Sequence, residues 1–599
     1  MTAPSWDLSF AYSGLSGEDY AADIAKINAL IAQIAELTPS DITNCQQALS
    51  LSEQAGILTQ SLSTYANCLA SVDAKNQDAA LTLSKLSSLG AELSQAIKPF
   101  TNQLSTGTDE YFESVLTGSD EVGSFERFRF SLSIEREKKD TLLSVEEEQL
   151  LSAMNVDGRS AWGTLYNNIT GSMSVTLTLA DGTEEAMGLS QAASILYGPD
   201  DKRREPAWRA ISEAMKSNQV SFAAILNALS GSRLTEYKKR SKKKPVHFLD
   251  PALNDSRIVR ETLDTMMQVA KDNRHVGQQA GLSMAKLYGT DTLKPWDELA
   301  SMPALGSGES ETYTFDQAIS IIKKAFTGVD QEMADFVDMM VENNLIDAAP
   351  QPSKRLGAYC TLFAKTRTPM VFMTWGDSMS DVITLAHELG HAFHNWVMRD
   401  MPIAQSRYPM TLAETASIFA ENIVRDALMA EAKQESDKLM MLWEEAQSSL
   451  ALMINIPVRF EFEKAFYEQR EDGEFSAEKL SQLMAEKWSE WYGDAMAETN
   501  DMFWASKLHF SIAGVSFYNY PYLFGYLFSK GVYAQRGVKG DAFYADYKAL
   551  LRDTGSMSAE DVVEKHLGVD IREPTFWSDS VSQVTEQVNQ FNALVNDIK

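Results

Sequence analysis

The stretch Asp381-Val-Ile-Thr-Leu-Ala-His387-Glu388-Leu-Gly-His391 is the most informative part of this 599-residue chain. Ser378, just before it, can pair with Asp381 to cap the start of an α-helix. On that helix His387 and His391 are four positions apart, so both project from one face, about 6 Å apart along the axis. Two imidazoles at this spacing can share one zinc ion, and Glu388 beside them can reach a water molecule at the metal.

The histidine pair is unusual for a chain of this composition. With seven His and 83 acidic residues in the sequence, random placement gives on the order of 0.01 occurrences of His-Glu, any two residues, then His. His394 also lies close by, on the same helix face as His387, and is expected to support the site or the fold rather than to bind the metal. The alternative, a helix with ordinary surface or core histidines, fits this clustering poorly.

A zinc site also needs a third protein ligand and an open position for water. The downstream segment Pro409-Met-Thr-Leu-Ala-Glu414-Thr-Ala-Ser-Ile-Phe-Ala-Glu421 predicts a second helix. It starts far enough after His391 for the first helix to end and the chain to return. Glu414 and Glu421 share one face of this helix, so one can bind zinc while the other accepts a hydrogen bond from a ligating imidazole.

The elements around these motifs indicate a mainly helical protein. Apolar residues recur at three and four spacing through most of the chain, whereas residues 368–375 predict a short strand just before the histidine motif. One hairpin is expected at residues 173–179 and the arm after Asp181-Gly182. A loop near Tyr197 suggests an N-terminal helical region with a small hairpin, residues 1–200, followed by a catalytic region, residues 201–599.

The composition argues against several kinds of partner. The net charge of −30 repels nucleic acid and anionic membranes, so neither is expected to bind. No apolar run approaches the ~18 residues of a membrane span, and the N-terminus lacks the basic and apolar regions of a signal peptide. The three cysteines, Cys45, Cys68 and Cys360, predict no disulfide framework. Together these features predict a cytoplasmic protein.

A third region is rich in aromatic residues. It begins at His509-Phe and continues as Phe517-Tyr-Asn-Tyr520-Pro-Tyr522-Leu-Phe-Gly525-Tyr526. Tyrosine clusters of this kind are more often part of a core or an interface than of a catalytic site. Attack of water on a peptide carbonyl, however, builds an oxyanion that a positioned phenol or imidazole can stabilise.

These regions together resemble the thimet oligopeptidase and oligoendopeptidase F family of zinc metallopeptidases, and the oligoendopeptidase F branch most closely. The resemblance rests on the histidine motif, on Glu414-Thr-Ala-Ser417 and on the stretch from His509 to Tyr526. Weaker matches near Trp6, Leu143 and Gly357 extend it over almost the whole chain. It implies a mainly α, large helical zincin-type fold with a deep cleft between two helical halves and a small β element next to the active-site helix.

The resemblance also implies roles for individual residues. His387, His391 and Glu414 would bind one zinc ion per chain, and Glu388 would be the general base. His509, Tyr522 and Tyr526 would face the substrate, and Tyr526 is the preferred oxyanion donor because Gly525-Tyr-Leu-Phe best matches the end of the family segment. Residues 370–374 would form the strand along which the substrate backbone lies.

The predicted function is therefore a zinc-dependent oligoendopeptidase that hydrolyses internal bonds of short unstructured peptides. In this mechanism zinc activates water, Glu388 transfers its proton to the leaving amine, and a tyrosine shares the oxyanion. A zinc carboxypeptidase or dipeptidase with the same site is one alternative. An inactive helical peptide-binding scaffold is another, and it is disfavoured because His387, Glu388, His391 and Glu414 are all present.

Overall fold

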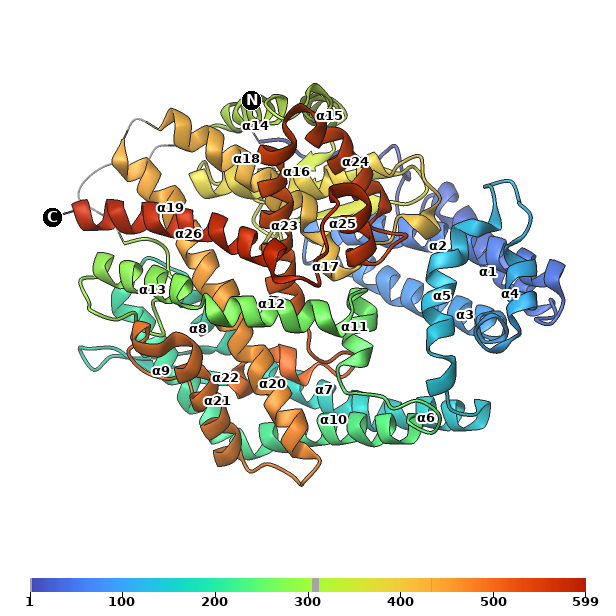
Figure 1. Ribbon diagram of the computed structural model, residues 1–599, viewed down its shortest axis with the longest axis horizontal. Helices are drawn as coiled ribbons and strands as arrows, with labels where there is room; N and C mark the ends of the chain where they lie inside the picture. Colours follow the sequence, from blue (N-terminus) through green and yellow to red (C-terminus); the bar gives the residue numbers. More distant parts are fainter. Residues whose placement is uncertain (1–2, 304–311, 433, 599) are drawn as a thin grey trace. The chain divides into compact units, whose positions relative to one another are not determined.

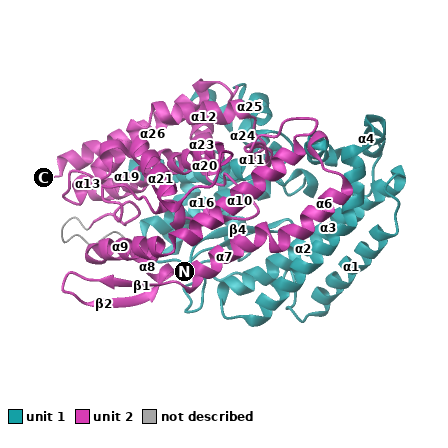
Figure 2. Ribbon diagram, turned by 90° about the horizontal axis from the view of Figure 1, so that it is seen from below, with its two compact units in different colours: residues 1–139, 310–431, 535–569 teal, residues 140–309, 432–534, 570–599 magenta. Residues whose placement is uncertain are grey.

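The computed structural model describes residues 3–303, 312–432 and 434–598 of the chain. The chain divides into two compact units, each built from three segments of the sequence (Figure 2). Unit 1 contains residues 1–139, 310–431 and 535–569, and unit 2 contains residues 140–309, 432–534 and 570–599. This partition differs from the division at residue 200 that the sequence indicated, because long-range packing joins segments that local patterns describe only one by one.

Unit 1 is mainly helical, with one small sheet (Figure 1). Its helices are α1 (Glu18–Ala35), α2 (Ile42–Val72), α3 (Gln77–Thr106), α4 (Asp109–Leu116), η1 (Phe125–Phe128), α5 (Arg129–Glu137), α14 (Phe315–Thr327), α15 (Gln331–Glu342), α16 (Met379–Val397), η3 (Ile403–Gln405), α17 (Met410–Ala413), α18 (Thr415–Glu431), η7 (Gly540–Ala542), α24 (Phe543–Asp553) and α25 (Ala559–Leu567). Side-chain caps stabilise several of their first turns, and Asp41 at the start of α2 accepts a hydrogen bond from the backbone N–H of Asn44.

The sheet of unit 1 lies next to α16. Its strands are β3 (Ile346–Asp347), β4 (Tyr359–Phe363) and β5 (Thr368–Phe372), in the order β3-β5-β4. The central strand β5 is parallel to β3 and antiparallel to β4. It is buried over its last four residues, and α16 packs against both β5 and β4. The predicted small β element beside the histidine helix is therefore confirmed.

Unit 2 is also mainly helical (Figure 1). Its helices are α6 (Val145–Asp157), α7 (Arg159–Ser172), α8 (Leu189–Ile195), α9 (Asp201–Ser217), α10 (Gln219–Arg240), α11 (Asp250–Ser256), α12 (Arg260–Asp272), α13 (His275–Leu287), α19 (Glu435–Leu450), η4 (Ala451–Asn455), α20 (Ile456–Arg470), α21 (Ala477–Tyr492), η5 (Gly493–Ala495), α22 (Phe503–Ser506), η6 (Leu508–Ser511), α23 (Tyr520–Lys539) and α26 (Pro574–Asp597). The last residues of α23 belong to unit 1, and η2 (Lys139–Thr141) spans the first boundary between the units.

The hairpin expected before residue 200 is present in unit 2. Its strands β1 (Ser174–Thr178) and β2 (Glu184–Gly188) are antiparallel, and Gly182 in the turn has a φ of +84° that favours glycine. Val175 and Leu177 point to one side and form a small core with Ala192 and Ala207. Among the residues that the structure describes, no helix combines the length and the apolar character that crossing a membrane requires.

Candidate metal centre

The predicted histidine helix is α16, and its start is fixed by the predicted cap. Ser378 Oγ accepts a hydrogen bond from the backbone N–H of Asp381, and the Asp381 carboxylate accepts one from the backbone N–H of Ser378. This reciprocal arrangement satisfies two N–H groups that a helix N-terminus otherwise leaves unpaired. The register of α16 is therefore set about two and a half turns before His387.

Gly390 allows α16 to lie unusually close to α18. A Cβ atom at Gly390 would lie 2.5 Å from the carbonyl oxygen of Ala416 and 2.6 Å from the Cα atom of Ser417. Side-chain atoms do not approach backbone atoms this closely, so only glycine fits at this crossing. The close approach brings the start of α18, and Glu414 just before it, beside the two histidines.

We expect Gly390→Ala to destabilise unit 1 by about 1–3 kcal/mol, because the added methyl group must displace the backbone of α18. The displacement also moves Glu414, so metal affinity should fall together with stability. Thermal unfolding and a metal-competition titration measure the two effects. Gly90→Ala is the matched control, since Gly90 lies in helix α3 with no atom within 4 Å of the added Cβ. An unchanged metal affinity in Gly390→Ala would contradict the positioning role.

Three potential ligand atoms converge between these helices. The Nε2 atoms of His387 and His391 are 3.1 Å apart, and Glu414 Oε2 lies 3.5 Å from each of them. Zinc binds such ligands at about 2.0–2.1 Å, and a tetrahedron with bonds of that length has edges of about 3.3 Å. The three separations therefore fit a tetrahedral ion with its fourth position left for water. The ligand atoms of His387, His391 and Glu414 all lie within 4.8 Å of one another, so this group of described residues could hold a metal ion.

Other side chains orient the ligands. Glu421 Oε1 accepts a hydrogen bond from His387 Nδ1 at 2.5 Å, which places the ring proton on Nδ1 and leaves the Nε2 lone pair free for a metal. Ser417 Oγ donates a hydrogen bond to Glu414 Oε2 at 2.7 Å. Of the two carboxylates that the sequence pattern left open, Glu414 lies against the two Nε2 atoms and Glu421 supports His387.

The electrostatics of this group favour a cation. Burial lowers the pKa of His387, but its hydrogen bond to Glu421 and the charges of Glu421, Glu414 and Glu388 together raise it to about 9. Three carboxylates thus surround two half-buried imidazoles and hold positive charge at His387. A divalent metal ion would satisfy the same requirement and leave both imidazoles neutral.

Glu388 has the properties of a general base rather than of a ligand. Its side chain is buried, and its Oε2 atom has no hydrogen-bond partner among the described residues. Burial raises its pKa to about 7, as do the charges of Glu414 and Glu421, while His387 opposes the shift. A carboxylate with one unused oxygen and a pKa near neutrality can accept and return a proton.

His394 has a structural environment, in line with its expected supporting role. The ring is fully buried, and its Nε2 atom is hydrogen-bonded to Thr554 Oγ1 at 2.9 Å and to the carbonyl oxygen of Leu551 at 3.2 Å. It also stacks on Tyr408, with ring centroids 4.1 Å apart. Burial lowers the pKa of His394 to about 3, so the ring is neutral. These contacts tie α16 to the end of α24 within unit 1.

The prediction that the substrate backbone lies along residues 370–374 is wrong. Both edges of β5 are already paired, because Met370 and Phe372 lie opposite residues of β4, and Phe372 also lies opposite Asp347 of β3. The outer strands of this sheet are β3 and β4, and β4 is the longer of the two. Strand β4 packs against the histidine helix α16. Asn395 of α16 donates a hydrogen bond from Nδ2 to the carbonyl oxygen of His391, and the same Nδ2 lies 3.8 Å from Cys360 Sγ in β4.

The aromatic stretch lies in unit 2. His509 is in η6, Tyr522 is in the first turn of α23, and Tyr518 lies between them in the chain. The ring centroids of these three half-buried residues are 6.0–6.2 Å apart, so they form one cluster. Sequence reasoning did not single out Tyr518. The sequence shows Tyr518 within the run of tyrosines. Because residues 512–519 form a loop, however, helical spacing could not predict which rings contact His509.

Tyr526 has a different environment from Tyr522. It is buried, and its hydroxyl donates a hydrogen bond to Glu445 Oε1 at 2.6 Å. Lys530 Nζ lies 2.8 Å from the same oxygen and donates to Gln587 Oε1 at 2.7 Å. The Tyr526 hydroxyl is therefore part of a buried network that ties α23 to α19 and α26. Its role as oxyanion donor stays a prediction.

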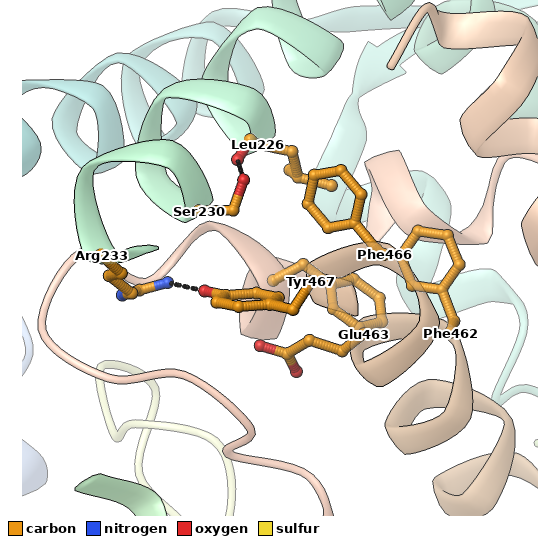
Figure 3. Close-up of a pocket in the computed structure, with 8 residues that line it drawn as sticks. Leu226, Ser230, Arg233, Phe462, Glu463, Phe466 and Tyr467 are labelled. Atoms are coloured by element: carbon orange, nitrogen blue, oxygen red, sulfur yellow. Dashed lines mark hydrogen bonds between the residues drawn. The ribbon is translucent and has the colours of Figure 1, made fainter. Parts of the chain in front are cut away.

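A small pocket elsewhere in unit 2 is lined by polar and aromatic side chains (Figure 3). Arg233 on α10 donates a hydrogen bond from Nη1 to the hydroxyl of Tyr467 at 2.8 Å, and Glu463 lies beside them. The remaining wall is largely aromatic, and the cavity volume is about 10 Å³. Because this volume holds about one water molecule, the pocket is too small for a peptide.

Comparison with known proteins identifies the family. A model described as peptidase family M3 matches residues 194–582, and one described as oligopeptidase F matches residues 109–174. The group B oligopeptidase PepB of Streptococcus agalactiae is 24% identical over 453 residues, covering 74% of this chain and 71% of that protein. The oligoendopeptidase F homolog of Lactococcus lactis is 22% identical, covering 87% of this chain and 86% of that protein.

Solved structures share the fold. The crystal structure of a Chlamydophila abortus protein has a TM-score of 0.84 at 18% identity and covers 98% of both chains. Oligoendopeptidase-F from Enterococcus faecium has a TM-score of 0.71 at 17% identity, covering 97% of this chain and 98% of that one. The M3 model spans well over half of the sequence and contains both helices of the metal centre. The chain therefore belongs to peptidase family M3 and is a metallopeptidase.

Proposed function

We propose that this chain is a zinc-dependent oligoendopeptidase that hydrolyses internal bonds of short unstructured peptides. One observation carries the proposal. The Nε2 atoms of His387 and His391 and the Oε2 atom of Glu414 have the mutual separations of tetrahedral zinc ligands, and a buried carboxylate with an unused oxygen, Glu388, lies next to the first of them in the chain. The oligopeptidases among the relatives support the substrate class.

The residues of the chain divide the chemistry between them. When bound, zinc supplies a Lewis acid that polarises the scissile carbonyl and acidifies a water molecule. Glu388 accepts the proton of the attacking water and delivers it to the leaving amine. Glu421 holds the His387 ring in one orientation through Nδ1. A hydroxyl or imidazole from the His509–Tyr526 stretch donates a hydrogen bond to the developing oxyanion.

The substrate backbone is expected to add to the free edge of β4. An outer strand offers unpaired N–H and C=O groups, and an extended peptide can pair with them whatever its side chains are. Leu362 in this strand already has its carbonyl oxygen bonded by Thr64 Oγ1 at 3.2 Å. The edge open to a peptide therefore lies toward Cys360 and Tyr359. This choice replaces residues 370–374.

Tyr522 is favoured over Tyr526 as the oxyanion donor, because the hydroxyl of Tyr526 is engaged by Glu445. We expect Tyr522→Phe to lower kcat about 10²–10³-fold with little change in KM. Tyr526→Phe should mainly cost stability, about 0.5–1.5 kcal/mol, since it removes the hydrogen bond to Glu445 while Lys530 keeps its contact with the same oxygen. Steady-state kinetics and thermal unfolding of both variants separate the two roles. The opposite kinetic order would return the donor role to Tyr526.

The function as a whole is tested with one peptide sequence in two forms. We expect the purified protein to cleave the free peptide at an internal bond, to lose this activity with a chelator, and to regain it with zinc. The same sequence in a stable loop of a folded domain should be cleaved at least about 10²-fold more slowly, because reaching a recessed metal requires local unfolding. Mass spectrometry identifies the bond.

Each alternative gives a different product. Successive loss of single residues from the C-terminus would indicate the carboxypeptidase, and cleavage of dipeptides alone would indicate the dipeptidase. Comparable rates for the free and the looped sequence would contradict the oligopeptidase proposal while leaving the metal chemistry in place. Zinc binding without hydrolysis of any peptide would favour the inactive scaffold.

A further inference from the structure

Two cations lie beside the aromatic cluster of unit 2. Arg459 on α20 and Lys507 between α22 and η6 both pack on the ring of Phe503, with the Arg459 Cζ atom 5.2 Å and the Lys507 Nζ atom 4.9 Å from its centroid. Both side chains are half-buried. Like charges in a half-buried position repel each other, so holding both cations here costs free energy.

Neither cation has a carboxylate partner at ion-pair distance among the described residues. Arg459 Nε donates to Asn455 Oδ1 at 2.8 Å, and its Nη1 lies 3.5 Å from Asn519 Oδ1, so both partners are neutral amides. The ammonium group of Lys507 has only the Phe503 ring as a described contact. This differs from the buried Lys530, whose charge is matched by Glu445.

The acidic group that interacts electrostatically with both cations, Glu298, is already hydrogen-bonded to other residues. Glu298 is buried and accepts hydrogen bonds from the hydroxyl of Tyr492 and from Asn455 Nδ2. Arg459 and Lys507 act on its charge from a distance. One carboxylate therefore interacts with two cations, so Arg459 and Lys507 together keep an excess positive charge. The chain as a whole has a net charge of −30.

The excess positive charge acts on the aromatic cluster, as the pKa of His509 shows. Burial lowers the pKa of His509 to about 4, with further lowering by Arg459 and Lys507. The pKa of Lys507 is lowered to about 8, first by burial and then by Arg459. Arg459 also interacts electrostatically with Tyr522. A bound anion would relieve all of these repulsions together.

We propose that Arg459 and Lys507 form a carboxylate-binding subsite beside His509 and Tyr522 that anchors a carboxylate of the peptide substrate. Arg459 supplies a planar guanidinium that matches a carboxylate, and Lys507 supplies a point charge. The anchored group is either the C-terminal carboxylate or an acidic side chain. This inference rests on the proposed peptidase function and deepens it, because an anchor at a chain end would select short peptides.

The test compares one cleavable peptide as the free acid, as the C-terminal amide, and as the amide with Glu or Gln at the last position. We expect the wild-type kcat/KM to be about 10–100-fold higher for the carboxylate form that is anchored, mainly through KM. Lys507→Gln and Arg459→Gln should each bring this ratio close to one. Lys479→Gln, at an exposed lysine of α21, is the matched control and should keep the wild-type ratio.

The outcomes separate the subsite from the function. A preference for the acid over the amide identifies the C-terminal carboxylate, and a preference for Glu over Gln in the amides identifies the side chain. Cleavage of all four peptides at similar rates would overturn the subsite and leave the peptidase standing, whereas cleavage of none would overturn both. Equal losses on every peptide in Lys507→Gln and Arg459→Gln would assign both cations a structural role and also overturn the subsite.

Discussion

Glu388→Gln should keep the bound metal and the fold but lower kcat about 10²–10⁴-fold. The substitution retains the shape of the side chain and removes its ability to accept a proton. Glu388 is buried, its Oε2 atom is unused by the described residues, and burial raises its pKa to about 7. A neutral amide should therefore be accommodated without disturbing His387 or His391. Single-turnover kinetics with a quenched fluorescent peptide, together with metal analysis, measure the expected effect.

The matched control is Glu342→Gln, which makes the same chemical change at an exposed residue of unit 1 at the end of α15. It should leave kcat and metal content as in the wild type. Near-normal turnover in metal-loaded Glu388→Gln would remove Glu388 from the role of base. Loss of metal in that variant would instead mean that the side chain supports the ligands.

The parts of the fold that could be predicted are those with a local signal. The helix α16 was predicted from its cap and its histidine spacing, and β5 from a run of β-forming residues. The position of β5 between β3 and β4 could not be predicted, because strand order depends on pairing between distant segments. For the same reason the two compact units, each made of three segments, leave no signal in local composition.

The site shows the same limit at the level of single residues. The sequence presented Glu414 and Glu421 as equivalent positions on one helix face. Their different environments follow from the crossing of α16 and α18 at Gly390, a contact between segments more than 20 residues apart. In the aromatic stretch a loop separates His509 from Tyr518 and Tyr522, so helical spacing gave no guide to which rings would meet.

Glu414→Ala should remove most of the bound zinc and, with it, the peptidase activity. The variant keeps both imidazoles but loses the oxygen that lies 3.5 Å from each Nε2 atom. Two neutral ligands leave two of the four coordination positions to water and the ion without a balancing charge, whereas catalytic zinc sites use three protein ligands. Metal analysis after dialysis and a chelator-competition titration measure the loss directly.

Glu421→Gln is the comparison variant, because it distinguishes a residue that binds the metal from one that only orients a metal-binding histidine. Because Glu421 reaches the centre through His387 Nδ1, its replacement should lower zinc affinity only about 10–100-fold and leave a site that fills when zinc is in excess. Glu414→Ala should remain largely empty under the same conditions. If Glu414→Ala retained full zinc and Glu421→Gln lost it, the two carboxylates would exchange roles. The geometry argues against that exchange, since Glu421 Oε1 is held on the far nitrogen of the His387 ring while Glu414 Oε2 faces both Nε2 atoms.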